Sequence, residues 1–568
     1  MRILLSLLLI LCLTSCKGTL KKAEQDGLNK SKYQAAISTI NKEATLVGEQ
    51  ILKQGGNAFD AAVAIQFTLA VTYPRAGNLG GGGFAVIRTS ANEYNAFDFR
   101  EKAPMLATTD MYLDENGNAL KEKSLHGPLA GGVPGTIKGM WAIHQKYGEL
   151  KWEALLQPAI ELAKNGFVLG KQEATRLNQA REDFEQYNRT DFEHPFLVKE
   201  WRVGDVLKQK VLASTLQEIA ELGEAAFYDG KTGSNFISDI ELFGGIISRE
   251  DLRKYKAVER QPIIGNFKGY EVVSMPPPSS GGVALVQLLN GVSKYPVSVW
   301  GRNSAKTIHV YTELMRRVYA DRSMHLGDPD FNFIATQKLV TKDYLDQRFL
   351  GINENIKSNS VDVKPGNPTK IESFETTHFS VLDSKGNCVS MTVTLNSSYG
   401  SKVWLPSVGF FLNNEMDDFS VKAGVANQFG LVGGKFNEIK PEKRMLSSMT
   451  PTIVTKNGEP VLVIGSPGGS TIITSVFQTL MNVVEFNMSL EDAVNAPRMH
   501  HQWQPDEILL EKGWFSQSTN DSLISMGHSL SFIKRLGLMN CVSVDSNKVS
   551  SAVGDKKRYM GYSVVLEK

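Results

Sequence analysis

Apolar residues recur along the chain at two different periods. Residues 45–72 are rich in alanine and carry apolar side chains at helical spacing, which predicts a tightly packed helical segment. Glycines at 80–83 interrupt this pattern, and alternating runs within 84–99 predict strands. Residues 154–165 return to helical spacing and are followed by Gly166, a residue type that commonly ends helices. This part of the chain is therefore predicted to be mixed α/β.

A polar stretch separates this part from strongly β sequence. Residues 355–375 are rich in Ser, Asn, Lys and Pro and lack periodicity, so they predict an exposed connection. The apolar run 379–382, the turn signal 383–387 and the alternating run 388–394 follow. Together these three runs predict a β-hairpin, with a boundary in the chain just before it.

The first residues have the pattern of a secretory signal. An apolar run over 3–13 is too short to cross a bilayer core of about 30 Å as a helix. It ends in Leu13-Thr14-Ser15-Cys16, which resembles the bacterial lipobox. We expect a signal peptide over 1–15, lipidation of Cys16 and a flexible tether over 16–32. The protein is then exported to the periplasm and attached to a membrane only through its lipid; an ordinary signal peptide ending near a cysteine is the alternative.

Composition narrows the classes of function. The 568 residues are 42% hydrophobic and 21% charged, which is typical of globular proteins and not of disordered ones. The 62 Lys and Arg nearly balance the 60 Asp and Glu, so the net charge of +2 offers no field for nucleic acid. Four scattered cysteines and nine mostly isolated histidines form no metal-binding motif. We expect no metal, no cofactor and no nucleic-acid partner, and we expect Cys388, Cys541 and the pair His500-His501 to be packing residues.

Three glycine-rich segments lack the features of a nucleotide site. Gly80 to Gly83 leads into a strand instead of a helix, and Pro276 to Gly282 lacks a phosphate-binding lysine and predicts a rigid turn. Gly465 to Ser470 lies between an apolar strand at 461–464 and a helical run from Thr471, again without the lysine. Backbone N–H groups at such a helix start can stabilise a developing negative charge, so this loop is either an oxyanion hole or a simple turn.

A long, ordered set of motifs surrounds the predicted hairpin. It comprises Thr376 to Val381, Gly386-Asn387, Leu395-Asn396, Tyr399-Gly400, Asn413 to Phe419, Leu446 to Met449, Gly465 to Ser470 and Asn495 to His501, with Asp98 to Glu101 and Pro276 to Gly282 upstream. Through these motifs essentially the whole mature chain resembles the γ-glutamyltransferase family. The resemblance implies an α/β (α+β) fold, the four-layer αββα sandwich of the N-terminal nucleophile hydrolases.

The resemblance also implies that the precursor cuts itself between Glu375 and Thr376. The products are a large subunit ending at 375 and a small catalytic subunit, 376–568, which stay together as a heterodimer. Thr376 is then the nucleophile, and its own α-amine, with an ordinary pKa of about 7.7 to 8.0, takes the hydroxyl proton. The resemblance assigns the oxyanion to Gly468 and Gly469 and a supporting hydrogen bond to Thr394.

A γ-glutamyl substrate carries an α-carboxylate and an α-ammonium, so its pocket needs both signs of charge. By resemblance, Arg100, Ser447 and Ser448 hold the carboxylate, and Asn396, Glu415 and Asp418 receive the ammonium. Two features vary within the family. Position 415 carries either glutamine or glutamate. A lid over 425–437 has Phe429 where a tyrosine is common, which removes a hydroxyl and leaves the balance of hydrolysis and transfer open.

The activity implied is that of a γ-glutamyltransferase and glutathione hydrolase. The γ-glutamyl ester on the nucleophile passes to water or to an amino acid or peptide acceptor. Glutathione is the leading donor, and glutamine and poly-γ-glutamate are alternatives. The alternatives are a glutaryl or cephalosporin-type acylase of the same superfamily and an inactive lipoprotein that binds γ-glutamyl compounds.

Overall fold

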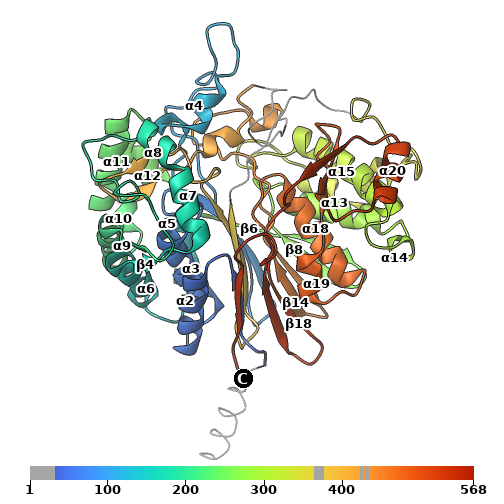
Figure 1. Cartoon of the computed structure of the whole chain (residues 1–568), viewed down its shortest axis with the longest axis horizontal. Helices are drawn as coiled ribbons and strands as arrows, with labels where there is room; N and C mark the ends of the chain where they lie inside the picture. The colour runs from blue at the N-terminus through green and yellow to red at the C-terminus, as the bar shows by residue number, and fades with distance from the viewer. Residues whose placement is uncertain (1–31, 364–375, 423–427, 429–430, 432–433, 568) are drawn as a thin grey trace, which may run out of the picture.

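Two antiparallel sheets face each other between two layers of helices (Figure 1). The computed structural model describes residues 32–363, 376–422, 428, 431 and 434–567. Strands β9 and β10 of the first sheet contact β14 of the second, so the core between the sheets is continuous. The implied αββα sandwich is confirmed.

The first sheet has seven strands. In spatial order they are β20 (Tyr562–Val565), β1 (Ala36–Thr39), β9 (Thr377–Leu382), β10 (Cys388–Thr394), β2 (Gly82–Arg88), β3 (Tyr94–Phe99) and β6 (Val258–Arg260). Strands from before and after position 376 are interleaved in this sheet, since β1 lies between β20 and β9, and β10 pairs with β2. The two predicted subunits therefore share one hydrogen-bonded sheet.

The second sheet has six strands and is also shared. In spatial order they are β19 (Ser550–Gly554), β18 (Asn540–Val544), β14 (Glu459–Ile464), β13 (Thr452–Lys456), β8 (Tyr270–Ser274) and β7 (Ile263–Phe267). The β13–β8 ladder joins the two predicted subunits here. Short sheets are formed by β15 (Met499–His500), β16 (Ile508–Glu511) and β17 (Leu530–Ile533), by β11 (Trp404–Leu405) and β12 (Phe410–Phe411), and by β4 (Phe167–Val168) and β5 (Val206–Leu207).

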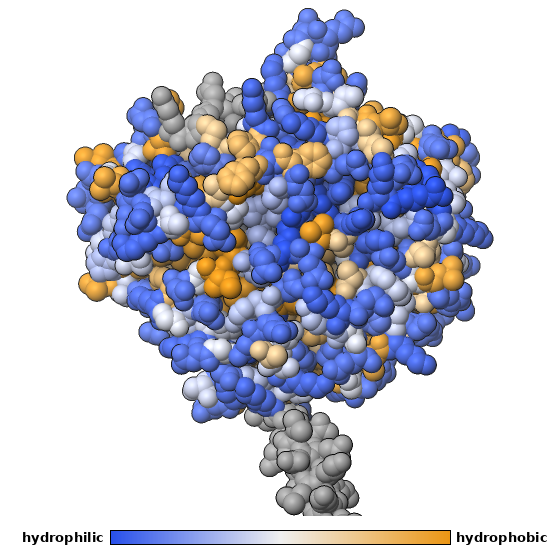
Figure 2. Space-filling view, turned by 180° about the vertical axis from the view of Figure 1, so that it is seen from behind, coloured by the Kyte–Doolittle hydropathy of each residue, from blue (hydrophilic) through white to orange (hydrophobic). Residues whose placement is uncertain are grey.

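Helices from different parts of the chain cover the two outer faces (Figure 1). On the side of the first sheet are α2 (Lys42–Lys53), α3 (Ala58–Thr72), α5 (Thr136–Tyr147), α6 (Trp152–Asn165), α7 (Lys171–Gln179), α8 (Arg181–Tyr187), α9 (Lys210–Leu222), α10 (Ala225–Tyr228), α11 (Lys231–Phe243) and α12 (Arg249–Lys254). On the side of the second are α13 (Gly281–Val292), α14 (Val297–Trp300), α15 (Ala305–His325), α18 (Thr471–Val484), α19 (Leu490–Asn495) and α20 (Gln517–Ser525). Hydrophilic residues cover most of the face shown in Figure 2, with apolar residues between them.

The predicted helical segment over 45–72 is two helices. Helix α2 ends at Lys53, and Asn57 caps α3 by accepting hydrogen bonds from the N–H groups of Phe59 and Asp60. All residues of α3 are buried, because its small alanines allow it to pack closely on β9 and β10. The break is the polar stretch Gln54-Gly55-Gly56-Asn57, a turn and N-cap signal that the apolar pattern of the flanking residues does not register.

The predicted hairpin is confirmed. Strands β9 and β10 pair with Leu382 opposite Cys388, and the Asp383 carboxylate accepts hydrogen bonds from the N–H groups of Lys385 and Asn387 in the turn. The connection before the hairpin is described up to residue 363, where it has neither helix nor strand and is exposed at most positions, as predicted, with Ser360 as the exception. Ser360 is fully buried, and its carbonyl accepts a hydrogen bond of 2.9 Å from the Trp503 indole, so this segment is fastened to the body of the protein.

Several expectations fall outside the described residues. These are the signal peptide, Cys16, the tether up to residue 31, Glu375 and Phe429. Among the residues that the structure describes, no helix combines the length and apolar character that a bilayer crossing requires.

Candidate active site

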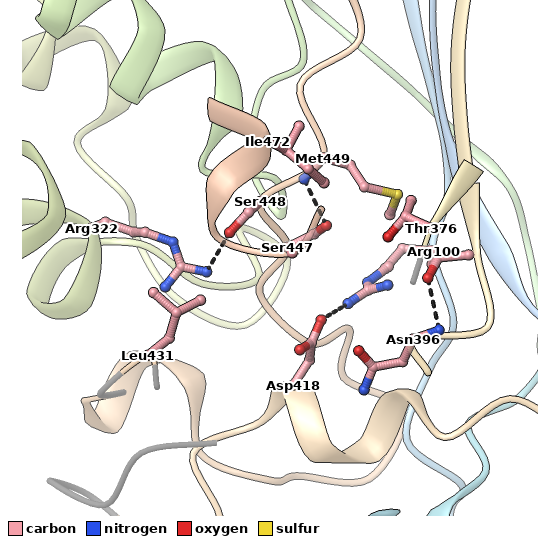
Figure 3. Close-up of a pocket in the computed structure, with 12 residues that line it drawn as sticks. Arg100, Arg322, Thr376, Asn396, Asp418, Leu431, Ser447, Ser448, Met449 and Ile472 are labelled. Atoms are coloured by element: carbon pink, nitrogen blue, oxygen red, sulfur yellow. Dashed lines mark hydrogen bonds and ion pairs between the residues drawn. The ribbon is translucent and has the colours of Figure 1, made fainter. Parts of the chain in front are cut away.

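A cavity that opens to solvent brings the predicted site residues together (Figure 3). It is lined by Arg100, Arg322, Thr376, Thr394, Asn396, Asp418, Leu431, Ser447, Ser448, Met449, Gly469 and Ile472. These residues come from both predicted subunits and from segments that flank both sheets. Glu415 and Gly468, also predicted, do not line it and lie behind residues that do.

Thr376 and Thr394 lie at one end of the hairpin. Thr377 pairs with Val393, so the antiparallel register brings Thr376 opposite Thr394. Both are buried, with exposed fractions of 6% and 3%. The Thr394 hydroxyl accepts a hydrogen bond of 2.7 Å from the N–H of Asn396, a residue with φ of 72°. The hairpin therefore fixes the nucleophile candidate and its neighbour at the cavity wall.

The loop after β14 provides the candidate oxyanion site. Gly468 and Gly469 have φ of 139° and 53°, and α18 begins two residues later. A Cβ on Gly468 would lie 2.6 Å from the Thr471 hydroxyl, so only glycine fits. The predicted strand, loop and helix are confirmed, and the start of α18 has no side-chain cap. The positive end of its dipole therefore favours an anion beside Gly469, which lines the cavity.

Arg100 lies at the centre of a buried charged cluster. Its guanidinium Nη1 is 2.6 Å from Glu415 Oε2 and 3.4 Å from Glu101 Oε2, and Nη2 donates to Asp418 (Figure 3). The residues expected to hold the substrate's carboxylate and ammonium are thus paired with each other here. Figure 3 shows Arg100 and Asp418 pointing toward one another.

Burial controls the protonation of the three carboxyl groups. It raises the pKa of Glu415 well above its ordinary value and that of Asp418 above its own, while Arg100 opposes both rises. It raises the pKa of Glu101 to about 7, again against Arg100. The cluster can therefore hold a proton near neutral pH in addition to the arginine charge.

Ser447 and Ser448 lie opposite this cluster. The Ser447 N–H donates to Pro278 O over 2.9 Å, and its carbonyl accepts from the Ser280 N–H over 2.8 Å. The segment 276–282 was predicted to be a rigid turn before a helix, and it leads directly into α13. The same turn holds the two serines in place.

Four cavity residues were not assigned to the site from the sequence. Met449 and Leu431 lie in the motif 446–449 and in the predicted lid, whereas Arg322 on α15 and Ile472 on α18 lie outside every motif. Helix α15 carries many charged residues yet is buried along most of its length, and a charged helix ordinarily indicates a solvated face. Only the tertiary packing of α15 reveals Arg322 as a cavity residue.

The expected packing residues are buried. Cys388 and Cys541 are free thiols, and burial raises the pKa of Cys388 to about 12. His500 and His501 are also buried, and His500 Nδ1 hydrogen-bonds the Thr474 hydroxyl at 2.8 Å. Within the described ranges, no group of three or more His, Cys, Asp or Glu side chains is arranged to hold a metal ion.

Comparisons with known proteins agree with this geometry. Residues 44–565 match the model of the Gamma-glutamyltranspeptidase family. The chain is 44% identical over 515 residues to the glutathione hydrolase proenzyme of Escherichia coli (strain K12), covering 90% of this chain and 88% of that one. It is 36% identical over 553 residues to the glutathione hydrolase proenzyme of Bacillus subtilis (strain 168), with 91% of each chain covered.

Solved structures give the same result. The crystal structure of Helicobacter pylori gamma-glutamyltranspeptidase is 44% identical, with a TM-score of 0.55 over 57% of this chain and 94% of that chain. A cephalosporin acylase from Bacillus halodurans has a TM-score of 0.82 over 94% of this chain and 96% of its own, but at 24% identity it shows the fold alone. From the family model, the relatives and the shared fold, we conclude that this chain belongs to the γ-glutamyltranspeptidase family.

Proposed function

We propose that this chain is a self-processing glutathione hydrolase and γ-glutamyltransferase. The observation that carries the proposal is the single cavity in which Thr376 and Gly469 lie beside Arg100, Asp418 and the two serines. A nucleophile, an anion-stabilising backbone and binding groups of both charges are what cleavage of a γ-glutamyl amide requires.

Self-cleavage between Glu375 and Thr376 frees the amine of Thr376. Residues 33–375 then form the large subunit and 376–568 the small one. The shared ladders β1–β9, β10–β2 and β13–β8 support a heterodimer that stays assembled after the cut, because separating the pieces breaks every one of these ladders.

In the reaction, the Thr376 amine accepts the hydroxyl proton while Oγ1 attacks the γ-carbonyl carbon. The resulting oxyanion is stabilised by the backbone at Gly468 and Gly469. The C–N bond then breaks, the leaving amine takes the proton, and a γ-glutamyl ester remains on Thr376. Water or the amine of an amino acid or peptide attacks this ester, which gives hydrolysis or transfer respectively.

Substrate binding exchanges ion pairs within the cluster. The α-carboxylate of a γ-glutamyl group competes with Asp418 for Arg100, and the α-ammonium then compensates Asp418 and Glu415, beside Asn396. The exchange leaves each buried charge paired, which a group without an ammonium does not achieve. The buried acidic pair therefore favours γ-glutamyl donors such as glutathione over the acyl groups of a glutaryl or cephalosporin acylase.

Export and lipidation complete the proposal. The signal-like run before Cys16, the lipobox-like sequence and the polar residues up to 32 support a periplasmic enzyme tethered by a lipid on Cys16. The folded body begins close behind this tether, with β1 at Ala36. Intact-mass analysis of the membrane fraction, compared with Cys16→Ala, tests the lipid: an unmodified Cys16 would contradict it.

The proposed function is tested by N-terminal sequencing and turnover of glutathione and a γ-glutamyl anilide. We expect two wild-type pieces, the smaller starting at Thr376, and one inactive, uncut chain for Thr376→Ala. The control is Thr377→Val, because the buried Thr377 hydroxyl has no hydrogen-bond partner in the described structure and valine has nearly the same shape. An uncut, inactive wild type would instead favour an inactive γ-glutamyl-binding protein.

A further inference from the structure

Arg322 is a buried cation in the cavity wall whose partners are hydroxyl groups. Its Nε donates to Ser280 Oγ over 2.9 Å. Its Nη2 donates to Ser448 Oγ over 3.1 Å, the contact drawn in Figure 3. No carboxylate of the described residues lies within ion-pair distance of it, although its side chain is only 5% exposed. Burial lowers the pKa of Arg322 to about 10, so it is still charged at neutral pH.

This arrangement contrasts with Arg100, whose guanidinium is surrounded by Glu101, Glu415 and Asp418. A buried guanidinium without an anion is costly unless a ligand supplies the missing charge. Arg322 therefore has no direct ion pair of its own in the described structure; Asp418, which pairs with Arg100, acts on Arg322 only at longer range. Arg322 lies on the side of the two serines.

The hydrogen bonds also fix the direction of the serine hydroxyls. A serine hydroxyl has one proton to donate, and accepting a hydrogen bond leaves that proton for another partner. Ser448 Oγ accepts from Arg322, and Ser447 Oγ accepts from the Met449 N–H over 3.1 Å. In the described structure neither hydroxyl donates to another protein group. Both protons are thus available to an anion in the cavity.

We infer that Arg322 is a positioning residue for the substrate's α-carboxylate, acting through Ser448. By donating to Ser448 Oγ, it turns the serine's proton toward the carboxylate and adds positive charge behind that hydrogen bond. Arg322 and Ser280 precede position 376, and Ser448 follows it. A side chain of the large subunit therefore sets the direction in which a serine hydroxyl of the small subunit donates its hydrogen bond. This inference rests on the proposed function and adds a residue to its specificity for α-carboxylates.

The test compares two competitive inhibitors of γ-glutamyl anilide cleavage. L-Glutamate carries the α-carboxylate, and 4-aminobutyrate is the same chain without it. In Arg322→Gln we expect the inhibition constant of L-glutamate to rise about 10-fold or more, as for the loss of a charge-assisted hydrogen bond. We expect that of 4-aminobutyrate to change less than about 2-fold, because it never contacts Ser448.

A double-mutant cycle separates action through Ser448 from general damage. Ser448→Ala should raise the inhibition constant of L-glutamate by a similar factor. The double variant, Arg322→Gln with Ser448→Ala, should raise this constant no further than Ser448→Ala alone. Arg348→Gln is the matched control, since it breaks the 2.7 Å ion pair with Asp321 next to Arg322 on α15 but lies outside the cavity. We expect wild-type inhibition by both compounds in this control.

Several outcomes would overturn the inference. These are equal changes for the two inhibitors, or additive effects in the cycle. If Arg322→Gln does not mature, Ser280→Ala takes its place, because it removes the other hydroxyl that holds the guanidinium. It should raise the inhibition constant of L-glutamate and leave that of 4-aminobutyrate nearly unchanged. Equal inhibition constants in Ser280→Ala and wild type would also overturn the inference. A wild type that matures but does not cleave the γ-glutamyl anilide contradicts the proposed function instead, so the two failures are distinguishable.

Discussion

Replacing Glu101 by glutamine should stabilise the protein at alkaline pH and leave it little changed in acid. Glu101 is completely buried beside Arg100, and burial raises its pKa from 4.5 to about 7. Its side chain has the shape of glutamine, so Glu101→Gln removes the charge with little change in packing. Arg100 keeps its shorter contacts with Glu415 and Asp418.

The direction follows from proton linkage. Between pH 4.5 and about 7 the folded protein binds more protons at Glu101 than the unfolded chain, so wild-type stability falls as pH rises through this window and is then constant. The full penalty above pH 7 is at most about 3 kcal/mol, from 1.36 kcal/mol for each pKa unit. Because Glu415 and Asp418 compete for the same proton, the observed midpoint belongs to the cluster.

The assay is thermal unfolding of mature wild type and Glu101→Gln at pH 4.5 and pH 8, at one ionic strength. We expect the melting temperature of the variant to exceed that of wild type at pH 8, and the two to converge at pH 4.5. A variant that is equally destabilised at both pH values would refute the reasoning, because Glu101 would then contribute a charged interaction with Arg100 that outweighs its burial.

Three further changes test other parts of the structure. Gly468→Ala should lower kcat for the γ-glutamyl anilide at least about 10-fold, because the new Cβ meets the Thr471 hydroxyl and shifts the oxyanion loop; unchanged turnover would mean that Gly468 is not part of the oxyanion site. Asp506→Asn should lower the free energy of unfolding by about 1.5 to 3 kcal/mol, measured by denaturation at pH 7, because the buried Arg316 loses a charged partner. Arg316 and His501 hold the pKa of Asp506 below its ordinary value against burial, so this difference should shrink as pH falls below about 4, and a constant difference would contradict that charge assignment. Ile37→Pro should separate the two pieces during size-exclusion chromatography, because it disrupts β1 between its two neighbours; co-elution at the wild-type position would show that the other ladders suffice.

Local signals in the sequence predicted the hairpin and the strand, loop and helix that hold part of the candidate site, whereas the residues of that site came from the family resemblance. The turn signal at 383–387 fixes the hairpin register, and that register brings Thr376 opposite Thr394. The order of strand, glycines and helix around 465–471 likewise follows from periodicity and backbone freedom. These predictions held because each depends on a short stretch of chain.

Contacts between distant segments were not readable in the same way. The motifs identified Arg100 and Asp418 as opposite ends of a substrate site, but their mutual ion pair joins residues 318 positions apart. Arg322 is buried only because α15 packs behind the turn that holds Ser447 and Ser448. The break between α2 and α3 is different, because a local signal marks it: Gly55-Gly56 interrupts the helical spacing and Asn57 caps the second helix.

The position of β20 has a consequence for the order of folding. Strand β1 is synthesised long before residues 562–565, which cover its outer edge in the folded protein. Until those residues arrive, the nascent chain presents an unpaired edge flanked by buried apolar side chains, which is a template for aggregation. The short strand β20 thus protects the edge of β1 in the first sheet from pairing with other chains. Removing β20 should therefore reduce the yield of soluble protein more than the activity of the protein that does fold.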